Sequence, residues 1–333
     1  MFEARGGNIA LNLARPDDRA LLPALFAADD FDPYDNAAIT ARVASADPDA
    51  LVARGRAMGL AMAAECESVS PAAACVAMTE APPSPPRATP PRVLDLSALW
   101  AGPLAAHLLW LAGADVVKLE NRTRPDAMRQ GAPAFFALLN QGKASVVLDF
   151  ANQADRNALG ALIATSDIVI EAARPRALAH LGIDADHIVR STPGLIWITI
   201  TGHGALGEAA NWVGFGDDCG VAGGLTAALR AASGTPGFVG DAIADPLTGI
   251  FAARLATKAW RDGQGGRFGI AMSAVAATAL AEARLAPTIN ADLAAWQAAA
   301  GQPFPPLPRR PMRARLHELG ADTQARLGTS AAC

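Results

Sequence analysis

Between Arg92 and Thr201, short apolar strands alternate with helical segments, and this repeat limits the fold more than any other feature. The strand-like segments are Arg92–Leu96, Val116–Leu119, Ser145–Leu148, Asp167–Glu171 and Leu195–Thr201. Near-continuous apolar strands, each followed by a helix, are typical of a parallel sheet covered on both faces. The sequence therefore predicts an α/β fold with a Rossmann-like, doubly wound parallel sheet. Such a sheet binds ligands beyond the carboxyl ends of its strands.

The segment before this repeat has a different character. One short strand is predicted at Asn8–Leu13, and helices are predicted at Pro16–Ala27 and from Asp47 to about Glu65. The prolines between Pro82 and Pro91 form a stiff, extended spacer. We therefore expect three parts: a small, mostly helical N-terminal segment at 1–80, a proline-rich linker at 81–92, and a larger ligand-binding domain at 93–333.

Composition and charge exclude several classes of function. The chain is 51% hydrophobic and 18% charged, which is typical of a globular protein with a large core. Its net charge of −4 argues against a nucleic-acid partner, because neutralising phosphates needs a basic surface. Apolar runs are too short or too interrupted to predict a membrane span. The four cysteines are scattered without metal-ligand spacing, so we expect no metal site, and a cytoplasmic location.

Beyond Thr201 the pattern is less regular. Residues 202–207 read GHGALG, which matches the glycine pattern of dinucleotide-binding loops. That fingerprint also needs a helix to open there, whereas 208–218 reads as a glycine-rich loop containing Asp217. A further strand is predicted at Arg267–Met272, followed by a helix to Leu285. A second proline cluster at 303–311 precedes a short helix predicted within 313–327.

Asp245 stands between small residues, just before a segment with helical character at 250–260. A carboxylate in this position often caps the start of a helix by accepting backbone hydrogen bonds. It can also act as a nucleophile, because an ionised carboxylate needs no base to activate it. The local sequence leaves both roles open.

A series of ordered motifs identifies a family. Residues 93–103 read VLDLSALWAGP, 113–120 read GADVVKLE, 140–149 read NQGKASVVLD, 166–175 read SDIVIEAARP, 178–183 read LAHLGI, and 193–204 read PGLIWITITGHG. In the same order they resemble VLDLSxxxAGP, GADVIKVE, NRGKRSVxLDL, ADVVVENFRPG, LxRLGL and NPRLIYxxISGFG of the family III CoA-transferases, the CaiB/BaiF type. The resemblance covers about 92–273, and its strength lies in the order of the matches.

The resemblance implies a covalent reaction. The family's nucleophilic aspartate maps to Asp245, which would attack an acyl-CoA thioester before a second carboxylic acid takes up the CoA. It also implies a CoA pocket at the strand ends within 93–333. Its residues are Leu99, Trp100, Ala101, Gly102, Asn121, Arg122, Leu148, Ala172, Ala173, Arg174 and His180. CoA thioesters would be substrates, and no permanently bound cofactor is implied.

The chain departs from the family in two respects. Phe215 aligns with the histidine of the family's racemases, and Asp217 replaces a partner carboxylate only after a shift of one residue. The family also inserts a small domain after the helix that follows Ser273, and here only a short stretch remains. Because 7–13 and the helices after it resemble small-domain sequence, the chain is interpreted as a permuted or truncated member.

The resemblance to the family III CoA-transferases predicts CoA transfer from an acyl-CoA to a carboxylic acid. The alternatives are a non-catalytic homologue that binds CoA esters, or a subunit of a larger transferase. A 2-methylacyl-CoA racemase is a further alternative. Family members form interlocked dimers, each chain a ring through the other. With the small part placed first, we expect a homodimer that is not interlocked, with no nucleic-acid or membrane partner.

Overall fold

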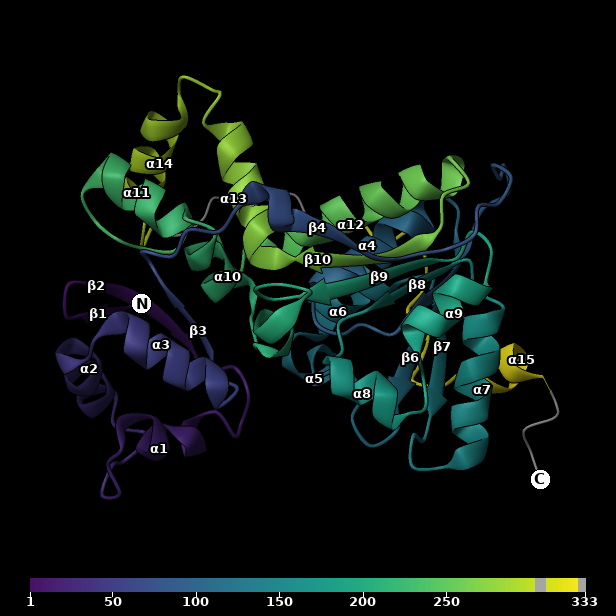
Figure 1. Cartoon of the computed structure of the whole chain (residues 1–333), viewed down its shortest axis with the longest axis horizontal. Coiled ribbons are helices and arrows are strands. Elements are labelled where there is room, and N and C mark those ends of the chain that lie inside the picture. The colour runs from purple at the N-terminus through teal and green to yellow at the C-terminus, as the bar shows by residue number, and fades with distance from the viewer. Residues whose placement is uncertain (303–309, 329–333) are drawn as a thin grey trace. The chain divides into compact units, whose positions relative to one another are not determined.

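The computed structural model of the protein describes residues 1–302 and 310–328 (Figure 1). The residues form two compact units that interleave along the sequence. The first comprises 1–75, 201–247 and the described part of 270–305, and the second comprises 76–200, 248–269 and the described part of 306–333. The expected division of the chain into domains at 1–80, 81–92 and 93–333 stays a prediction.

A seven-stranded sheet with the order β4-β10-β9-β8-β5-β6-β7 forms the centre of the second unit. Its strands are β4 (Cys75–Glu80), β5 (Arg92–Asp95), β6 (Asp115–Asn121), β7 (Ala144–Leu148), β8 (Ile168–Glu171), β9 (Ile196–Thr201) and β10 (Gly266–Ala271). The β5–β6, β6–β7, β5–β8 and β8–β9 pairs are parallel. The predicted α/β class with a doubly wound sheet is thus confirmed.

The winding of this sheet reverses at β5. The chain proceeds outward through β6 and β7, and then returns to place β8 and β9 on the opposite side of β5. In register, Leu94 lies between Val117 and Val169. All three side chains are buried in one core cluster, which explains the unbroken apolar pattern of these strands. A crevice at such a reversal is where doubly wound sheets bind ligands.

Helices flank this sheet, and their bounds follow the strands closely. They are α4 (Ala101–Leu111), α5 (Met128–Gly131), α6 (Pro133–Asn140), α7 (Gln153–Ala164), α8 (Pro175–His180), α9 (Ala185–Ser191), α12 (Ala244–Arg261, which begins in the first unit) and α15 (Thr323–Leu327). In Figure 1, α12 lies on one side of β8 and β9, and α7, α8 and α9 lie on the other. Every helix in the described part of the chain is too short or too polar to span a lipid bilayer.

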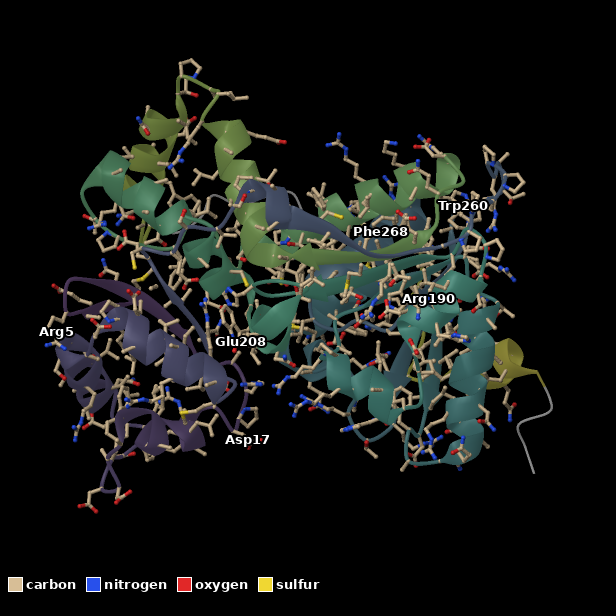
Figure 2. The ribbon with its side chains drawn as sticks, in the orientation of Figure 1. Arg5, Asp17, Arg190, Glu208, Trp260 and Phe268 are labelled. Atoms are coloured by element: carbon tan, nitrogen blue, oxygen red, sulfur yellow. The ribbon has the colours of Figure 1, made fainter. Side chains whose placement is uncertain are left out.

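The proline-rich segment packs against the second unit. Pro82 O accepts a hydrogen bond from Gly194 N at 2.9 Å. Trp260, labelled in Figure 2, donates its indole N–H to Thr89 O at 3.1 Å. Arg87 lies over the Trp260 ring, 4.6 Å from its centroid, and pairs with Asp167 at 2.8 Å. The segment is extended as predicted, and these contacts fix it to the unit that follows it.

The first unit contains a three-stranded antiparallel sheet with the order β1-β2-β3. Its elements are β1 (Phe2–Ala4), β2 (Gly7–Asn12), β3 (Ala61–Ala64), α1 (Leu22–Phe26), α2 (Asn36–Ser45), α3 (Pro48–Ala57), α10 (Gly216–Ala222), α11 (Leu225–Ser233), α13 (Met272–Ala283) and α14 (Ile289–Ala298), with 3-10 turns η1 (Arg19–Leu21), η2 (Pro71–Ala74) and η3 (Gly207–Asn211). Ile9, Leu22, Val43 and Met62 are fully buried in its core.

Several boundaries in this unit and at the chain's end differ from prediction. The helix expected at Pro16–Ala27 starts only with the 3-10 turn η1 at Arg19, and α1 ends at Phe26. The helix expected to reach about Glu65 ends at Ala57, because Gly59 adopts a left-handed conformation (φ +83°) and the chain turns into β3. The loop expected at 208–218 ends in α10, which begins at Gly216. The terminal helix is confined to α15, and most of the proline cluster at 303–311 lies outside the described residues.

Candidate active site

Asp245 lies in the first turn of α12, the longest helix of the chain. It is partly exposed, whereas the preceding Ala244 is fully buried and anchors the start of the helix. Its backbone N–H donates to Ala242 O at 2.9 Å, which closes the turn that leads into α12. Negative charge is favourable at a helix N-terminus, so this position suits an ionised carboxylate.

The carboxylate lies against the backbone of α10. A Cβ added at Gly216 would stand 2.3 Å from Asp245 Oδ2 and 2.2 Å from Ala242 O, so only glycine fits. Ala242 itself is held at φ +44°, a conformation that residues with a side chain rarely adopt. Strain of this kind persists only where the surrounding structure enforces it, and it is frequent at functional sites.

Asp217, the second carboxylate suggested by the sequence, belongs to the first turn of α10 rather than to a loop. Its Oδ1 accepts a hydrogen bond from Ala242 N at 3.0 Å, so it holds the turn that carries Asp245. Burial raises the pKa of Asp217, and the nearby carboxylates of Asp241 and Asp218 raise it further, against the stabilising effect of the Ala242 N–H.

The residues expected to bind CoA gather at the carboxyl ends of four neighbouring strands. The stretch 99–102 follows β5, Asn121 and Arg122 end and follow β6, Leu148 ends β7, and 172–174 follow β8. His180 lies in the last turn of α8. The structure therefore brings these segments to one edge of the sheet. Arg122, Arg174 and His180 are exposed there, whereas Ala101, Gly102 and Leu148 are buried.

The loop between β5 and α4 depends on a close approach. A Cβ on Gly102 would stand 2.2 Å from Ser97 Oγ, so the tight turn requires glycine. Buried Lys118 donates to Ser97 O at 2.9 Å and pairs with Asp126 at 3.1 Å. Asp126 in turn accepts from the backbone N–H of Leu99, at 3.3 and 3.2 Å for its two oxygens, and Leu99 adopts φ +67°.

A second buried ion pair supports the same loop. Lys143 Nζ donates to Asp95 Oδ2 at 2.8 Å, to Pro103 O at 2.9 Å and to Asn140 Oδ1 at 2.9 Å. Burial lowers the pKa of Lys143 to about 8, against the opposing attraction of Asp95. Burial alone would raise the pKa of Asp95, but Lys143 and Lys118 together hold it below its usual value. The loop is therefore fixed by side chains that are themselves inaccessible to solvent.

His107 on α4 is buried within the second unit. Its side chain stacks on Trp110 with ring centroids 5.4 Å apart, and neither ring nitrogen has a hydrogen-bond partner in the described structure. Burial lowers the pKa of His107 to about 4, and the positive charges of Lys143, Arg310 and Arg313 add to the effect. The imidazole is therefore neutral at pH 7 and contributes to packing.

His203 is a structural residue rather than a free loop histidine. Its Nε2 lies 3.0 Å from Asp218 Oδ2, and its Nδ1 lies 3.2 Å from Arg56 Nη2. Its ring meets Trp212 edge-on, with centroids 6.2 Å apart. Only 2% of its side chain is exposed.

One group of side chains has the composition of a metal site. The ligand atoms of His203, Asp218 and Cys219 lie within 4.8 Å of one another. The hydrogen bonds oppose this use: Arg56 can only donate, so it needs a lone pair on Nδ1 and leaves the proton on Nε2, where a metal would bind. Burial also raises the pKa of the Cys219 thiol well above its usual value, and the thiol points to Gly202 O at 3.3 Å. The cluster therefore suits a hydrogen-bonded network rather than a metal site.

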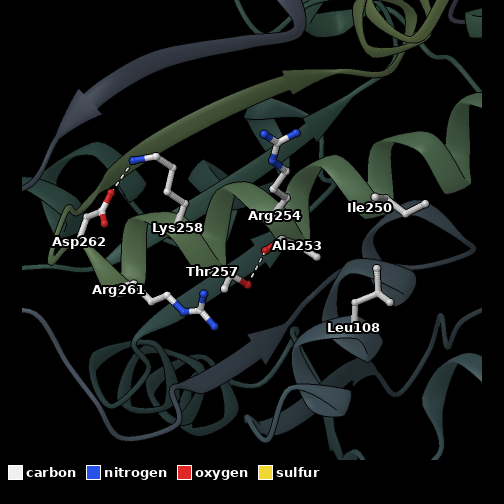
Figure 3. A pocket seen from close by; sticks show the side chains of 8 residues that line it. All are labelled: Leu108, Ile250, Ala253, Arg254, Thr257, Lys258, Arg261 and Asp262. Atoms are coloured by element: carbon white, nitrogen blue, oxygen red, sulfur yellow. Dashed lines mark hydrogen bonds and ion pairs between the residues drawn. The ribbon is translucent and has the colours of Figure 1, made fainter. Parts of the chain in front are cut away.

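A groove of about 570 Å³ runs along α12 in the second unit (Figure 3). It is lined by Leu108, Ile250, Ala253, Arg254, Thr257, Lys258, Arg261 and Asp262. Lys258 pairs with Asp262 at 2.5 Å. None of the residues expected to bind CoA lines this groove.

Sequence reasoning did not identify Gly216 or Arg56 as part of the site. The sequence signal for Gly216 was weak. An acidic residue at the third position of a helix, as Asp218 is after Phe215, often marks a helix start, but the flanking glycines indicated a loop. No local signal pointed to Arg56, because its partner His203 is 147 positions away.

Comparisons with known proteins identify relatives of this chain. The family model described as CoA-transferase family III matches residues 91–302. A succinate–glutarate CoA-transferase of Agrobacterium fabrum is 30% identical over 61% of this chain and 55% of its own length. A succinyl-CoA–L-malate CoA-transferase beta subunit of Chloroflexus aurantiacus is 32% identical over 48% of this chain and 42% of its own.

The fold is also found among solved structures. A crystal structure of a hypothetical protein from Mycobacterium tuberculosis superposes with a TM-score of 0.53 and 29% identity, over 61% of this chain and 60% of that one. The chain spans about half the length of the curated relatives it matches.

Proposed function

Because the chain belongs to the family III CoA-transferases, we propose that it transfers CoA from an acyl-CoA to a carboxylic acid, with Asp245 as nucleophile. The observation that carries this proposal is the position of Asp245. Its carboxylate stands at the N-terminal turn of a long helix, against a glycine that cannot be replaced without a clash. Relatives that bear the names of CoA-transferases support the same activity.

The chemistry would proceed by two acyl exchanges. The Asp245 carboxylate attacks the thioester carbonyl, which forms a mixed anhydride and releases the CoA thiolate. The thiolate then attacks the Asp245 carbonyl, forming an aspartyl thioester and releasing the first carboxylate. An incoming carboxylate reverses both steps, takes up CoA and regenerates ionised Asp245. Covalent catalysis of this kind divides one difficult exchange into easier steps.

CoA would bind along the strand ends of the second unit. Exposed Arg122 and Arg174 offer planar donors to phosphate oxygens, while Gly102 lets the turn after β5 pack closely against Ser97. Arg129 is less suited to that role, because its guanidinium already binds Glu120. Only the thioester and the acid would be needed, with no resident cofactor.

A second candidate is a CoA-ester-binding subunit of a larger transferase. One observation favours it: a relative is named as the beta subunit of a succinyl-CoA–L-malate CoA-transferase. In that case CoA would bind without forming an adduct. A family racemase has less support, because the Phe215 side chain has no acidic or basic group and both ring nitrogens of His203 already make hydrogen bonds.

The proposed assembly is a homodimer whose chains are not interlocked. The segment that resembles the family's small domain comes first in the chain, so no inserted domain would close a ring around the partner. Light scattering at several concentrations should give the mass of a dimer. A monomer, or a structure with threaded chains, would contradict this proposal.

Binding and transfer can be tested separately. Free CoA should raise the melting temperature by mass action, more than NADH or ATP at the same concentration. A panel of acyl-CoAs with acceptor acids should then give transfer. Stabilisation without transfer would favour the binding subunit, and stabilisation by NADH alone would support a dinucleotide site at 202–207 in place of CoA.

A further inference from the structure

Four side chains of the first unit form a continuous series of contacts from the loop after β3, through α3, to the start of α10. Glu67 binds Arg56 through both carboxylate oxygens, at 2.9 and 3.0 Å. Arg56 reaches His203 Nδ1 at 3.2 Å, and His203 Nε2 reaches Asp218 Oδ2 at 3.0 Å. We call Glu67, Arg56, His203 and Asp218 the relay.

The relay is too buried to be an ordinary surface network. The exposed fractions of the Arg56, His203 and Asp218 side chains are 7%, 2% and 0%, and only Glu67 at its outer end is partly exposed, at 22%. Arg56 is fixed further by its Nε, which donates to Met62 O at 2.9 Å, and by the Trp212 ring 4.6 Å beneath its guanidinium. Removing one member of such a network leaves the others buried without a partner, so its members act together.

The direction of its hydrogen bonds fixes the tautomer of the neutral His203 ring. A guanidinium has donors and no acceptor, so His203 Nδ1 must present a lone pair to Arg56. The single proton of the neutral ring is then on Nε2 and is donated to Asp218. The relay is therefore a one-directional series in which Arg56 sets the tautomer that Asp218 needs.

The relay ends beside Asp245. Asp218 Oδ1 accepts the backbone N–H of Phe215 at 2.9 Å and so fixes the residue that immediately precedes α10. Gly216 follows directly, and its Cα is the surface against which Asp245 Oδ2 rests. A displacement of the α10 start therefore changes the position of the Asp245 carboxylate.

We propose that Arg56 and His203 are positioning residues for Asp245, so that the N-terminal segment 1–75 forms part of the catalytic unit. The proposal rests on the function proposed above, in which Asp245 is the nucleophile. Neither residue touches the substrate in this account. They fix the side chain of Asp218, and Asp218 fixes the start of α10. The start of α10 in turn contacts the Asp245 carboxylate.

The test compares variants that break the relay with one that preserves its donor. Arg56→Met and His203→Phe remove the polar contacts, whereas His203→Gln retains an N–H near the position of Nε2. Arg54→Met is the matched control, because Arg54 is exposed on the same helix and donates to Leu25 O outside the relay.

Two readouts do not depend on activity. Nitrogen NMR of the histidine rings should place the proton of the neutral His203 ring on Nε2. Amide hydrogen exchange should show Phe215 protected in the wild type, His203→Gln and Arg54→Met, and much less protected in the two breaking variants.

Two further readouts report on Asp245. With an acyl-CoA that the wild type uses, kcat and the rate of Asp245 acylation should fall about 10- to 100-fold in the breaking variants, as expected for a misplaced reacting group. KM should change little, because the residues expected to bind CoA belong to the other unit. His203→Gln and Arg54→Met should stay within about threefold of the wild type.

Each outcome decides a specific point. Loss of both Phe215 protection and acylation in the breaking variants supports the proposal. Unchanged Phe215 exchange overturns it, whether or not the wild type reacts. Lost protection with full acylation also overturns it, because the relay would then hold α10 without positioning Asp245. A wild type that forms no adduct with any acyl-CoA overturns the proposed function, and the positioning role with it, while the exchange data still report on the relay.

Discussion

The buried histidine on α4 predicts a measurable pH dependence of stability. The pKa of His107 falls from its ordinary value of 6.5 to about 4 in the folded state, first because of burial. As pH falls below 6.5 the unfolded chain binds a proton that the folded protein does not, so the free energy of unfolding decreases as pH falls towards 4. The full effect of these two pKa values is about 3 kcal/mol, and about 2 kcal/mol of it is lost between pH 7 and pH 5.

The assay is urea unfolding at pH 7 and pH 5, for the wild type and for His107→Leu. Other carboxylates and histidines titrate in both proteins, so the difference between the two pH responses isolates His107. Tryptophan fluorescence and circular dichroism should give coincident transitions for the comparison to be valid. The wild type should lose about 2 kcal/mol more than the variant on acidification. Equal losses in both proteins would refute a neutral, buried His107.

Three other perturbations follow from the structure. Lys143→Met should leave Asp95 buried without the cation it pairs with and lower the free energy of unfolding by about 3–5 kcal/mol, as measured by denaturant titration. An unchanged denaturation midpoint would show that the pair is not buried in solution. Gly216→Ala should abolish transfer, because the new methyl group occupies the space of the Asp245 carboxylate. CoA binding, measured by thermal shift, should be retained. Full transfer activity would contradict the contact between Gly216 and Asp245. A 2-methylacyl-CoA should not exchange its α-proton in deuterated water, since Phe215 supplies no second acid or base, and rapid deuterium uptake monitored by NMR would indicate a racemase.

The sheet could be predicted from the sequence because burial on both faces leaves a direct trace in it. Val93, Val116 and Ile168 begin apolar runs that each became a strand of the sheet, with ends within two residues of expectation. The segments after β5, β6, β7 and β8 then fall at one edge by topology alone, which is why the expected CoA-binding residues are neighbours in the fold.

The first unit could not be predicted in the same way. Its strands β1 and β3 are short, and β3 is fully buried alanine and methionine, which carries no alternating pattern. The start of α10 depends on Asp218, which accepts from the N–H of Phe215 three residues earlier and contacts His203 fifteen residues earlier. Contacts such as Arg56 with His203 are set by tertiary packing, so a single sequence gives no indication of them.

The central claim is that Asp245 forms a covalent bond to the transferred group, and trapping that bond tests it most directly. The protein is incubated with a panel of acyl-CoAs, quenched with hydroxylamine and digested with trypsin, and the peptide from Ala231 to Arg254 is fragmented in a mass spectrometer. Asp241→Asn is the matched control, because Asp241 is an exposed aspartate in the same peptide. The account predicts a hydroxamate on Asp245 in the wild type and in Asp241→Asn, and none in folded Asp245→Asn. Transfer activity that persists in Asp245→Asn, or an adduct on another residue, would contradict it.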